Sequence, residues 1–146
     1  MNISTLAQLI AHVESNNNSL AVRFEPEYST APHIIAAMKE IADCSYNTAK
    51  VLCAMSWGKY QIMGANLISL GLKDSPLQYV ANDAMQDDFF HRYCAADHLT
   101  LTLADIQQSR DKRRLFCRLY NGPGNVDGYE SRLIEVGRSL GVEFIA

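Results

Sequence analysis

Apolar residues recur at helical spacing along most of the chain, and short polar or glycine-containing stretches separate the periodic segments. The first apolar stripe runs from Leu6 to Val13 and predicts a helix over about residues 5–15. Ser4 or Thr5 can serve as its N-cap. The asparagines at 16–18 tolerate turn and left-handed conformations, so we expect the helix to end there.

The same spacing predicts further helices downstream, and a short strand or extended loop is expected over residues 20–28, where the helical pattern fades. The expected helices are, in order, Pro32 to Ala42, a segment capped by Ser45, a short helix from Tyr60 to Leu70 with Ser56 as its cap, a long helix from Ser75-Pro76 to Tyr93, a brief helix capped by Thr102, a helix carrying Leu115 to Leu119, and a final helix from Tyr129 to Leu140. The fold class that follows is mostly α, with a small extended or β-hairpin segment after the first helix.

Length and composition are those of an ordinary globular domain. The chain has 146 residues, 48% hydrophobic and 20% charged, which predicts one domain over residues 1–146. The formal net charge of −3 argues against broad nucleic-acid binding. No apolar run approaches the ~18 residues that a membrane span needs, so stable membrane insertion is not expected. The N-terminal segment has no basic start, and we therefore expect no signal peptide.

Glu14 stands at the end of the first predicted helix, at the border of its apolar stripe. A carboxylate there can be partly desolvated by its own helix and still face a groove. Cleaving a glycosidic bond requires a proton delivered to the leaving oxygen, and a carboxylic acid whose pKa is raised by partial burial can supply it. Glu14 is therefore a candidate general acid. The alternative is a solvated carboxylate, slightly unfavourable beside the negative end of the helix dipole.

Residues 56–64 bring a hydroxyl, an indole, a phenol and an amide into one short segment. Sugars are bound by aromatic faces and by groups that both donate and accept hydrogen bonds, so Ser56, Tyr60 and Gln61 are candidate substrate-binding residues. The alternative is a packing role, and we expect both, with Gln61 facing outward and the apolar members in the core. Those members are Trp57, Ile62 and Met63, with Gly58 as a packing glycine.

Tyr120-Asn121 ends a predicted helix immediately before Gly122-Pro123-Gly124. A phenol at such an end can reach the acid and fix its orientation, which makes Tyr120 a candidate catalytic residue. The neighbouring amide makes Asn121 a candidate substrate contact. The alternative is a simple helix stop built on Asn-Gly turn chemistry.

Glu25 is the second candidate catalytic carboxylate, and Arg23 lies two residues before it. Glu25 can position or activate a water molecule, or it can form a surface salt bridge with Arg23. An inverting hydrolase needs a second carboxylate ~6.5–9.5 Å from the acid. A lytic transglycosylase needs none, because the C6 hydroxyl of the substrate attacks and leaves a 1,6-anhydro sugar. The role of Glu25 therefore bears on the reaction type, which the sequence leaves undecided.

The three blocks around residues 14, 56–64 and 119–124, in this order, resemble the lysozyme-like superfamily of lytic transglycosylases and goose-type lysozymes. Within it, they most resemble the N-acetylmuramidase domain of phage endolysins, from about residue 5 to 135. The resemblance implies a lysozyme-like fold in which Glu14 is the acid and Tyr120 lies beside it. It also implies that Gln61 faces the reacting sugar and that Asn121 contacts its N-acetyl group.

The expected activity is cleavage of the β-1,4 bond between N-acetylmuramic acid and N-acetylglucosamine in peptidoglycan glycan strands. The expected protein is a cofactor-free monomer, made in the host cytoplasm and delivered to the periplasmic wall by a holin or a virion. Leu119 stands where lytic transglycosylases typically place alanine, which favours the endolysin muramidases. A lytic transglycosylase and a non-cleaving peptidoglycan-binding virion protein are the alternatives, and a metal-dependent wall peptidase is a further one.

His91, Cys94 and His98 have a spacing that could bind zinc on one helical face, but a fourth ligand is not evident and helix packing is the favoured interpretation. We therefore expect no metal. The four cysteines are expected to stay reduced, with Cys53 and Cys117 buried in apolar surroundings. A basic cluster before the third block is expected to be a solvated helix face, with the carboxylates of peptidoglycan stems as an alternative partner: Arg110, Lys112, Arg113, Arg114 and Arg118.

Overall fold

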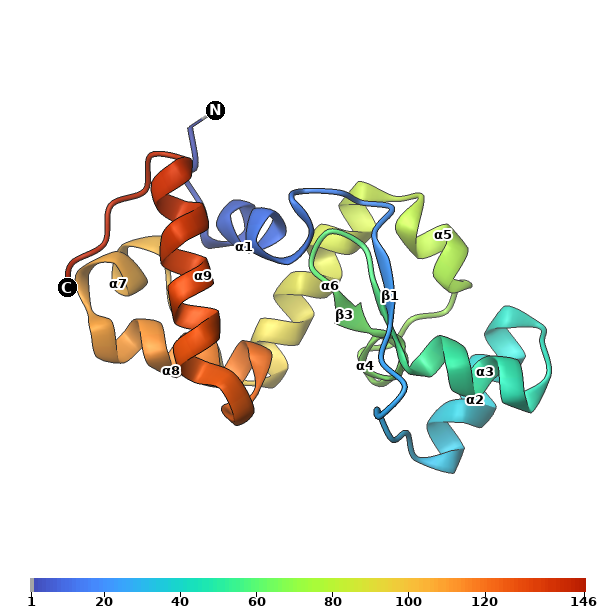
Figure 1. The fold of residues 1–146 in the computed structure, drawn as a ribbon. Coiled ribbons are helices and arrows are strands. Elements are labelled where there is room, and N and C mark those ends of the chain that lie inside the picture. Colours follow the sequence, from blue (N-terminus) through green and yellow to red (C-terminus); the bar gives the residue numbers. More distant parts are fainter. Residues whose placement is uncertain (1) are drawn as a thin grey trace. The chain divides into compact units, whose positions relative to one another are not determined.

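The computed structural model describes residues 2–146 and is mostly helical, with one small three-stranded antiparallel sheet (Figure 1). The mostly α class, with a β segment after the first helix, is confirmed. The chain forms two compact units, one made of residues 2–17 and 94–146 and the other of Asn18–Tyr93. Within residues 2–146, every helix is too short or too polar to cross a bilayer.

The first unit joins the N-terminal helix to the C-terminal third of the chain. Its elements are α1 (Leu6–Ser15), α7 (Leu103–Gln108), α8 (Arg110–Asn121), the 3-10 turn η1 (Pro123–Asn125) and α9 (Val126–Ser139). Thr5 is the N-cap of α1 and accepts a hydrogen bond from the Gln8 amide, as the sequence predicts. Asn16 ends the helix in a left-handed conformation with φ 55°.

Helix α1 packs against α9 in the core of this unit. Leu9, Ile10 and Val13 are fully buried on α1, and Leu133 is fully buried on α9. The apolar stripe that predicts α1 is therefore the face that meets α9. Because Glu14 follows Val13 directly, it lies at the edge of this interface.

The second unit contains the sheet and two groups of helices. Its elements are β1 (Val22–Phe24), α2 (Pro32–Ala42), α3 (Tyr46–Cys53), β2 (Met55–Trp57), β3 (Ile62–Met63), α4 (Gly64–Ser69), α5 (Pro76–Val80) and most of α6 (Asp83–Ala96). In the sheet, Ser56 of the central strand pairs with Arg23 on one side and with Met63 on the other. Helices α2, α3 and α4 share a core that includes Met38 and Cys53.

Two predicted elements of this unit are wrong. Ser56 does not cap a helix from Tyr60, because it lies in β2 and the next helix begins only at Gly64. Long-range pairing with β1 overrides the local capping signal. The predicted helix from Ser75 to Tyr93 is two helices, interrupted at Ala81 and Asn82. The Asn82 side chain accepts a hydrogen bond from the Met85 amide at 2.9 Å and so caps the start of α6.

The helical face that would have brought His91, Cys94 and His98 together, which the sequence analysis did not favour as a metal site, does not form. Helix α6 ends at Ala96, and His98 has φ 53°, so His91, Cys94 and His98 do not continue along one helical face. In the part of the chain from residue 2 onward, no three histidine, cysteine or acidic side chains gather as a metal site. Cys53 and Cys117 are fully buried, as predicted, and burial raises their pKa values to about 11 and about 12.

Candidate functional site

The carboxylate of Glu14 is held by a phenol from α9. Glu14 is partly buried in the last turn of α1, and its Oε1 accepts a hydrogen bond of 2.5 Å from the hydroxyl of Tyr129. The contact fixes the orientation of the carboxyl group that the sequence predicts to be the acid.

The phenol of Tyr129 remains protonated at every pH at which Glu14 could act as an acid. Its side chain is buried, and burial raises its pKa well above the ordinary value, with the negative charge of Glu14 acting in the same direction. The phenol is therefore a permanent hydrogen-bond donor to Glu14 and does not act as a base. Tyr129 is a positioning residue in this arrangement.

A buried ion pair fixes helix α9 just after Tyr129. Glu130 is 6% exposed and its two oxygens accept hydrogen bonds from Arg113 at 3.0 Å and from Arg114 at 2.7 Å. Arg113 also donates to the carbonyl oxygens of Ile106 and Ile145, at 3.0 and 3.2 Å. These bonds connect α8 and α9 to the end of α7 and to the C-terminal segment. Arg113 is 1% exposed, so the predicted solvated face does not include it.

Tyr120 is buried near the end of α8, and its ring stacks on Phe116 with centroids 5.4 Å apart. The catalytic role predicted for Tyr120 stays a prediction. Tyr129, whose hydroxyl donates to Glu14, was assigned by the sequence analysis only to the apolar stripe of the last helix. A usable signal was present, since a tyrosine in a buried stripe needs a polar partner for its hydroxyl. Asn121 is the exposed last residue of α8.

The second group of candidate residues surrounds the turn of residues 58–61, which connects β2 to β3. Gln61 adopts φ 52°, and its Oε1 accepts a hydrogen bond of 2.7 Å from the Ser56 hydroxyl. Its Nε2 donates to the carbonyl oxygens of Gly58 at 2.9 Å and Ala21 at 3.2 Å. The expectation of an outward-facing amide is therefore wrong in part, because Gln61 is partly buried and fastens the turn to the segment before β1.

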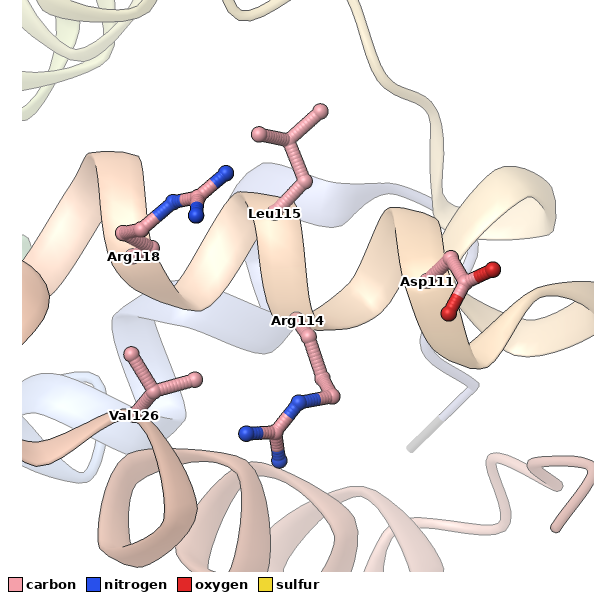
Figure 2. Close-up of a pocket in the computed structure, with 5 residues that line it drawn as sticks. All are labelled: Asp111, Arg114, Leu115, Arg118 and Val126. Atoms are coloured by element: carbon pink, nitrogen blue, oxygen red, sulfur yellow. The ribbon is translucent and has the colours of Figure 1, made fainter.

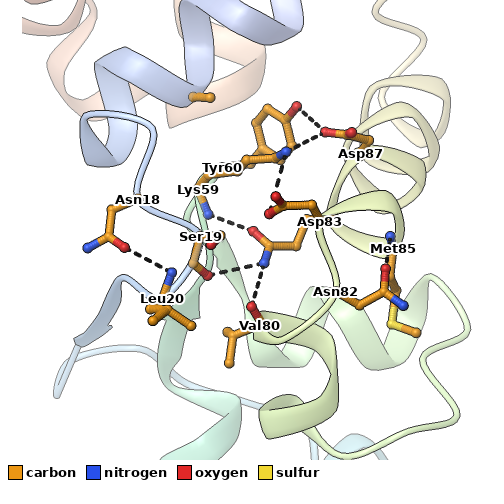
Figure 3. A network of polar contacts seen from close by, with 12 residues as sticks. Asn18, Ser19, Leu20, Lys59, Tyr60, Val80, Asn82, Asp83, Met85 and Asp87 are labelled. Carbon is orange, nitrogen blue, oxygen red and sulfur yellow. Dashed lines mark hydrogen bonds and ion pairs between the residues drawn. The ribbon is translucent and has the colours of Figure 1, made fainter.

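Two consecutive side chains of α6 hold the same turn from its other side. Gln86 is fully buried; its Oε1 accepts from the Lys59 amide at 2.8 Å, and its Nε2 donates to Ser19 O at 3.1 Å. Asp87 accepts from the Tyr60 hydroxyl at 2.6 Å and pairs with the Lys59 ammonium at 2.8 Å (Figure 3). The sequence analysis missed both residues, because no local pattern distinguishes them from other polar positions of α6.

The electrostatics of this network favour a charged Asp87. Burial acts to raise the pKa of Asp87, but the hydrogen bonds from Lys59 and Tyr60 outweigh it, so the pKa lies below its usual value. The Tyr60 ring is 3% exposed and stacks on Phe90 at 4.5 Å. These contacts give Tyr60 a structural role in the turn, and its predicted contact with sugar stays a prediction.

The backbone conformation and the close approach of Gln86 both favour glycine at position 58. Its φ is +75°, and an added Cβ would lie 2.3 Å from Gln86 Oε1. The Trp57 indole donates to Leu52 O at 3.1 Å, and both Trp57 and Ile62 are 3% exposed. The packing role predicted for Trp57 and Ile62 is confirmed, whereas Met63 is only partly buried.

Glu25 forms an ion pair with Arg23. The Arg23 Nε lies 2.8 Å from Glu25 Oε1, and the two side chains are 71% and 36% exposed. The backbone amide of Glu25 donates to Ala54 O at 2.8 Å, so the residue continues the edge of the sheet past β1. The structure thus contains the salt bridge that was the alternative to a catalytic Glu25.

Two comparisons with known proteins find relatives of this chain. The profile of the Muramidase family, described as N-acetylmuramidase, matches residues 28–140. The chain is also similar to an endolysin of Enterobacteria phage PRD1, with 32% identity over 149 residues that cover 95% of this chain and 98% of the relative. No solved structure matches significantly. The matched profile includes the turn at 58–61, Tyr120 and Tyr129, whereas Glu14 precedes it.

Proposed function

Because the chain belongs to the N-acetylmuramidase family and is a lysozyme-type glycoside hydrolase that degrades peptidoglycan, we propose that Glu14 is its general acid. The bond it cleaves is the β-1,4 bond between N-acetylmuramic acid and N-acetylglucosamine. The observation that carries this assignment is the hydrogen bond of 2.5 Å from the Tyr129 phenol to Glu14. A carboxyl group held in one orientation at a helix end is the arrangement that proton delivery requires.

In the proposed reaction, protonated Glu14 donates its proton to the glycosidic oxygen while the bond from C1 of muramic acid to that oxygen breaks. Positive charge develops on the sugar ring, and the ionised carboxylate that remains stabilises it. Water then adds to C1 and loses one proton, which restores protonated Glu14, and the product carries a reducing muramic acid end. Tyr129 donates to Oε1 throughout, so the carboxyl plane does not rotate during proton transfer.

Glu25 is the proposed residue for orienting the water, and its ion pair with Arg23 bears on that role. The Arg23 guanidinium, 2.8 Å from Glu25 Oε1, occupies the oxygen that would otherwise accept a hydrogen bond from that water. This observation favours the second candidate reaction, in which the muramic C6 hydroxyl attacks C1 and no second carboxylate is needed. The remaining proposed roles are a catalytic one for Tyr120 and sugar contacts for Ser56, Tyr60, Gln61 and Asn121.

Mass analysis of the soluble muropeptides that the wild-type protein releases from purified sacculi tests the proposal. Hydrolysis predicts muramic acid ends that borohydride reduces. Products one water lighter, and inert to borohydride, would establish the transglycosylase reaction. If the protein binds sacculi without releasing muropeptides, the enzymatic assignment of this chain fails and the binding alternative stands.

We also propose that the biological role matches the name of the PRD1 relative, an endolysin. The chain would then be made in the cytoplasm of an infected cell and reach the periplasmic wall through a holin pore or a virion. The match over 95% of the chain supports treating residues 1–146 as one catalytic domain. Its substrate partner is the glycan strand.

A further inference from the structure

Helix α8 carries five basic side chains, and four of them have acidic partners within the same unit. On α7, Asp105 pairs with Lys112 at 2.6 Å. On α9, Glu130 pairs with Arg113 at 3.0 Å and with Arg110 at 3.9 Å. Arg114 pairs with both Asp127 and Glu130 of α9, each at 2.7 Å. The side chain of Arg118 is exposed and makes no ion pair or hydrogen bond with any residue from 2 to 146. It is the one cation of α8 whose charge is not used inside this part of the protein.

Arg118 lines a pocket of about 250 Å³ on the surface of α8, together with Asp111, Arg114, Leu115 and Val126 (Figure 2). In Figure 2, Arg114 reaches toward α9, whereas Leu115 and Arg118 project from the other side of α8. Arg114 is neutralised by its two carboxylate partners. Asp111 is exposed and, among the described residues, has no cationic partner. The pocket therefore presents a cation, an anion and two aliphatic side chains.

The spacing of these groups defines the ligand that fits. Asp111 and Arg118 are seven residues apart on one helix, which corresponds to about 10 Å along its axis. Leu115 and Val126 provide the apolar surface of the same pocket. A matching ligand carries a carboxylate and an ammonium group at opposite ends of a short chain, with small apolar groups between them. Short peptides that contain an acidic residue, a diamino acid and alanine have this chemistry.

We propose that this pocket binds the peptide stem of peptidoglycan, with Arg118 pairing with a stem carboxylate and Asp111 with the free ammonium of the diamino residue. The alanine methyl groups of the stem contact Leu115 and Val126. This inference rests on the proposed function, because it assigns a second part of the same substrate. It makes the enzyme selective for glycan strands that still carry their peptides.

Direct binding tests the inference without any cleavage. The isolated stem tetrapeptide, which contains D-glutamate and a diamino acid, is titrated into the protein while the methyl resonances of Leu115 and Val126 are followed by NMR. We expect both methyl groups to shift. Arg118→Leu should weaken binding about fivefold, the upper range for a solvent-exposed ion pair. Arg110→Leu, on the same helix but outside the pocket, should leave the affinity unchanged. Unperturbed methyl resonances at millimolar peptide would overturn the proposal.

Kinetics provides a second, independent test. The ratio of kcat/KM on intact strands to kcat/KM on strands stripped of peptides by an amidase is measured for each variant. Arg118→Leu should lower this ratio about fivefold, and Arg110→Leu should not change it. Asp111→Asn should lower it only when the stem amine is free and not when it is acetylated. If Arg118→Leu leaves this ratio unchanged, the proposal that the pocket binds the peptide stem is wrong, even if the glycan is cleaved normally. If the wild-type protein binds the peptide but does not cleave the glycan, only the proposed function is wrong.

Discussion

The hydroxyl of Tyr129 on α9 donates a hydrogen bond of 2.5 Å to the carboxylate of Glu14 at the end of α1. The two residues are 115 positions apart, and the packing of α1 on α9 brings them together. The phenol keeps its proton because burial and the charge of Glu14 both raise its pKa. Glu14 therefore has a fixed donor at every pH at which the enzyme can work.

Removing this donor should lower the rate of the reaction. Tyr129→Phe keeps the buried ring and deletes one hydrogen bond to the proposed acid, so we expect kcat to fall about tenfold. A kcat within about twofold of the wild type would show that the Tyr129 contact does not act on the proposed acid. Tyr46→Phe is the control, because Tyr46 is an exposed phenol of the other unit and its removal should leave kcat unchanged.

The buried pair between Arg113 and Glu130 should carry much of the stability of the first unit. Arg113→Met leaves Glu130 without its buried partner and also removes the bonds to Ile106 O and Ile145 O. We expect the free energy of unfolding to fall by about 3–5 kcal/mol in urea denaturation. The exposed Arg138 provides the control, and Arg138→Met should stay within about 0.5 kcal/mol of the wild type. A loss below about 1 kcal/mol for Arg113→Met would mean that the pair contributes little.

Gly58 offers a test of the turn that carries Gln61. Gly58→Ala introduces a Cβ 2.3 Å from Gln86 Oε1 at a φ of +75°, so the free energy of unfolding should fall by about 2 kcal/mol. Gly124→Ala is the matched control, because nothing lies within 4 Å of its added Cβ. Equal stability of the two variants in urea would contradict the tight contact between the turn and α6.

The sequence predicts helices well where local chemistry decides them and fails where distant segments do. Ser45 and Thr102 cap helices as expected, because their hydroxyls accept from amides three residues ahead. Ser56 has the same local signal but lies in a strand, since pairing with Arg23 is a long-range interaction. Glu14 is a candidate acid only through its position at a helix end together with the two later blocks, and that role stays a prediction. A tyrosine in a buried stripe signals that its hydroxyl needs a polar partner, but only the packing of α1 on α9 makes Glu14 the partner of Tyr129. Gln86 carries no such signal, because its partners are set by tertiary packing alone.

The cysteines allow a check on burial in both units. Burial raises the pKa of Cys53 to about 11 and the pKa values of Cys94 and Cys117 to about 12, so their reactive thiolates are scarce at pH 8. Cys44 is only partly buried. We expect one thiol to react rapidly with a disulfide reagent in the native protein, and the others to react only in denaturant. Rapid reaction of two or more thiols would contradict the described packing.

The most direct test of the central claim is the initial rate of muropeptide release from purified sacculi by Glu14→Gln. Glutamine keeps the shape of the side chain and removes the transferable proton, and general acid catalysis contributes about 10²–10⁴ in rate. We predict a loss of about 10³-fold with unchanged unfolding free energy, and wild-type activity for Glu27→Gln, an exposed carboxylate on the other unit. A Glu14→Gln variant that retains more than about a tenth of the wild-type rate would show that Glu14 is not the acid.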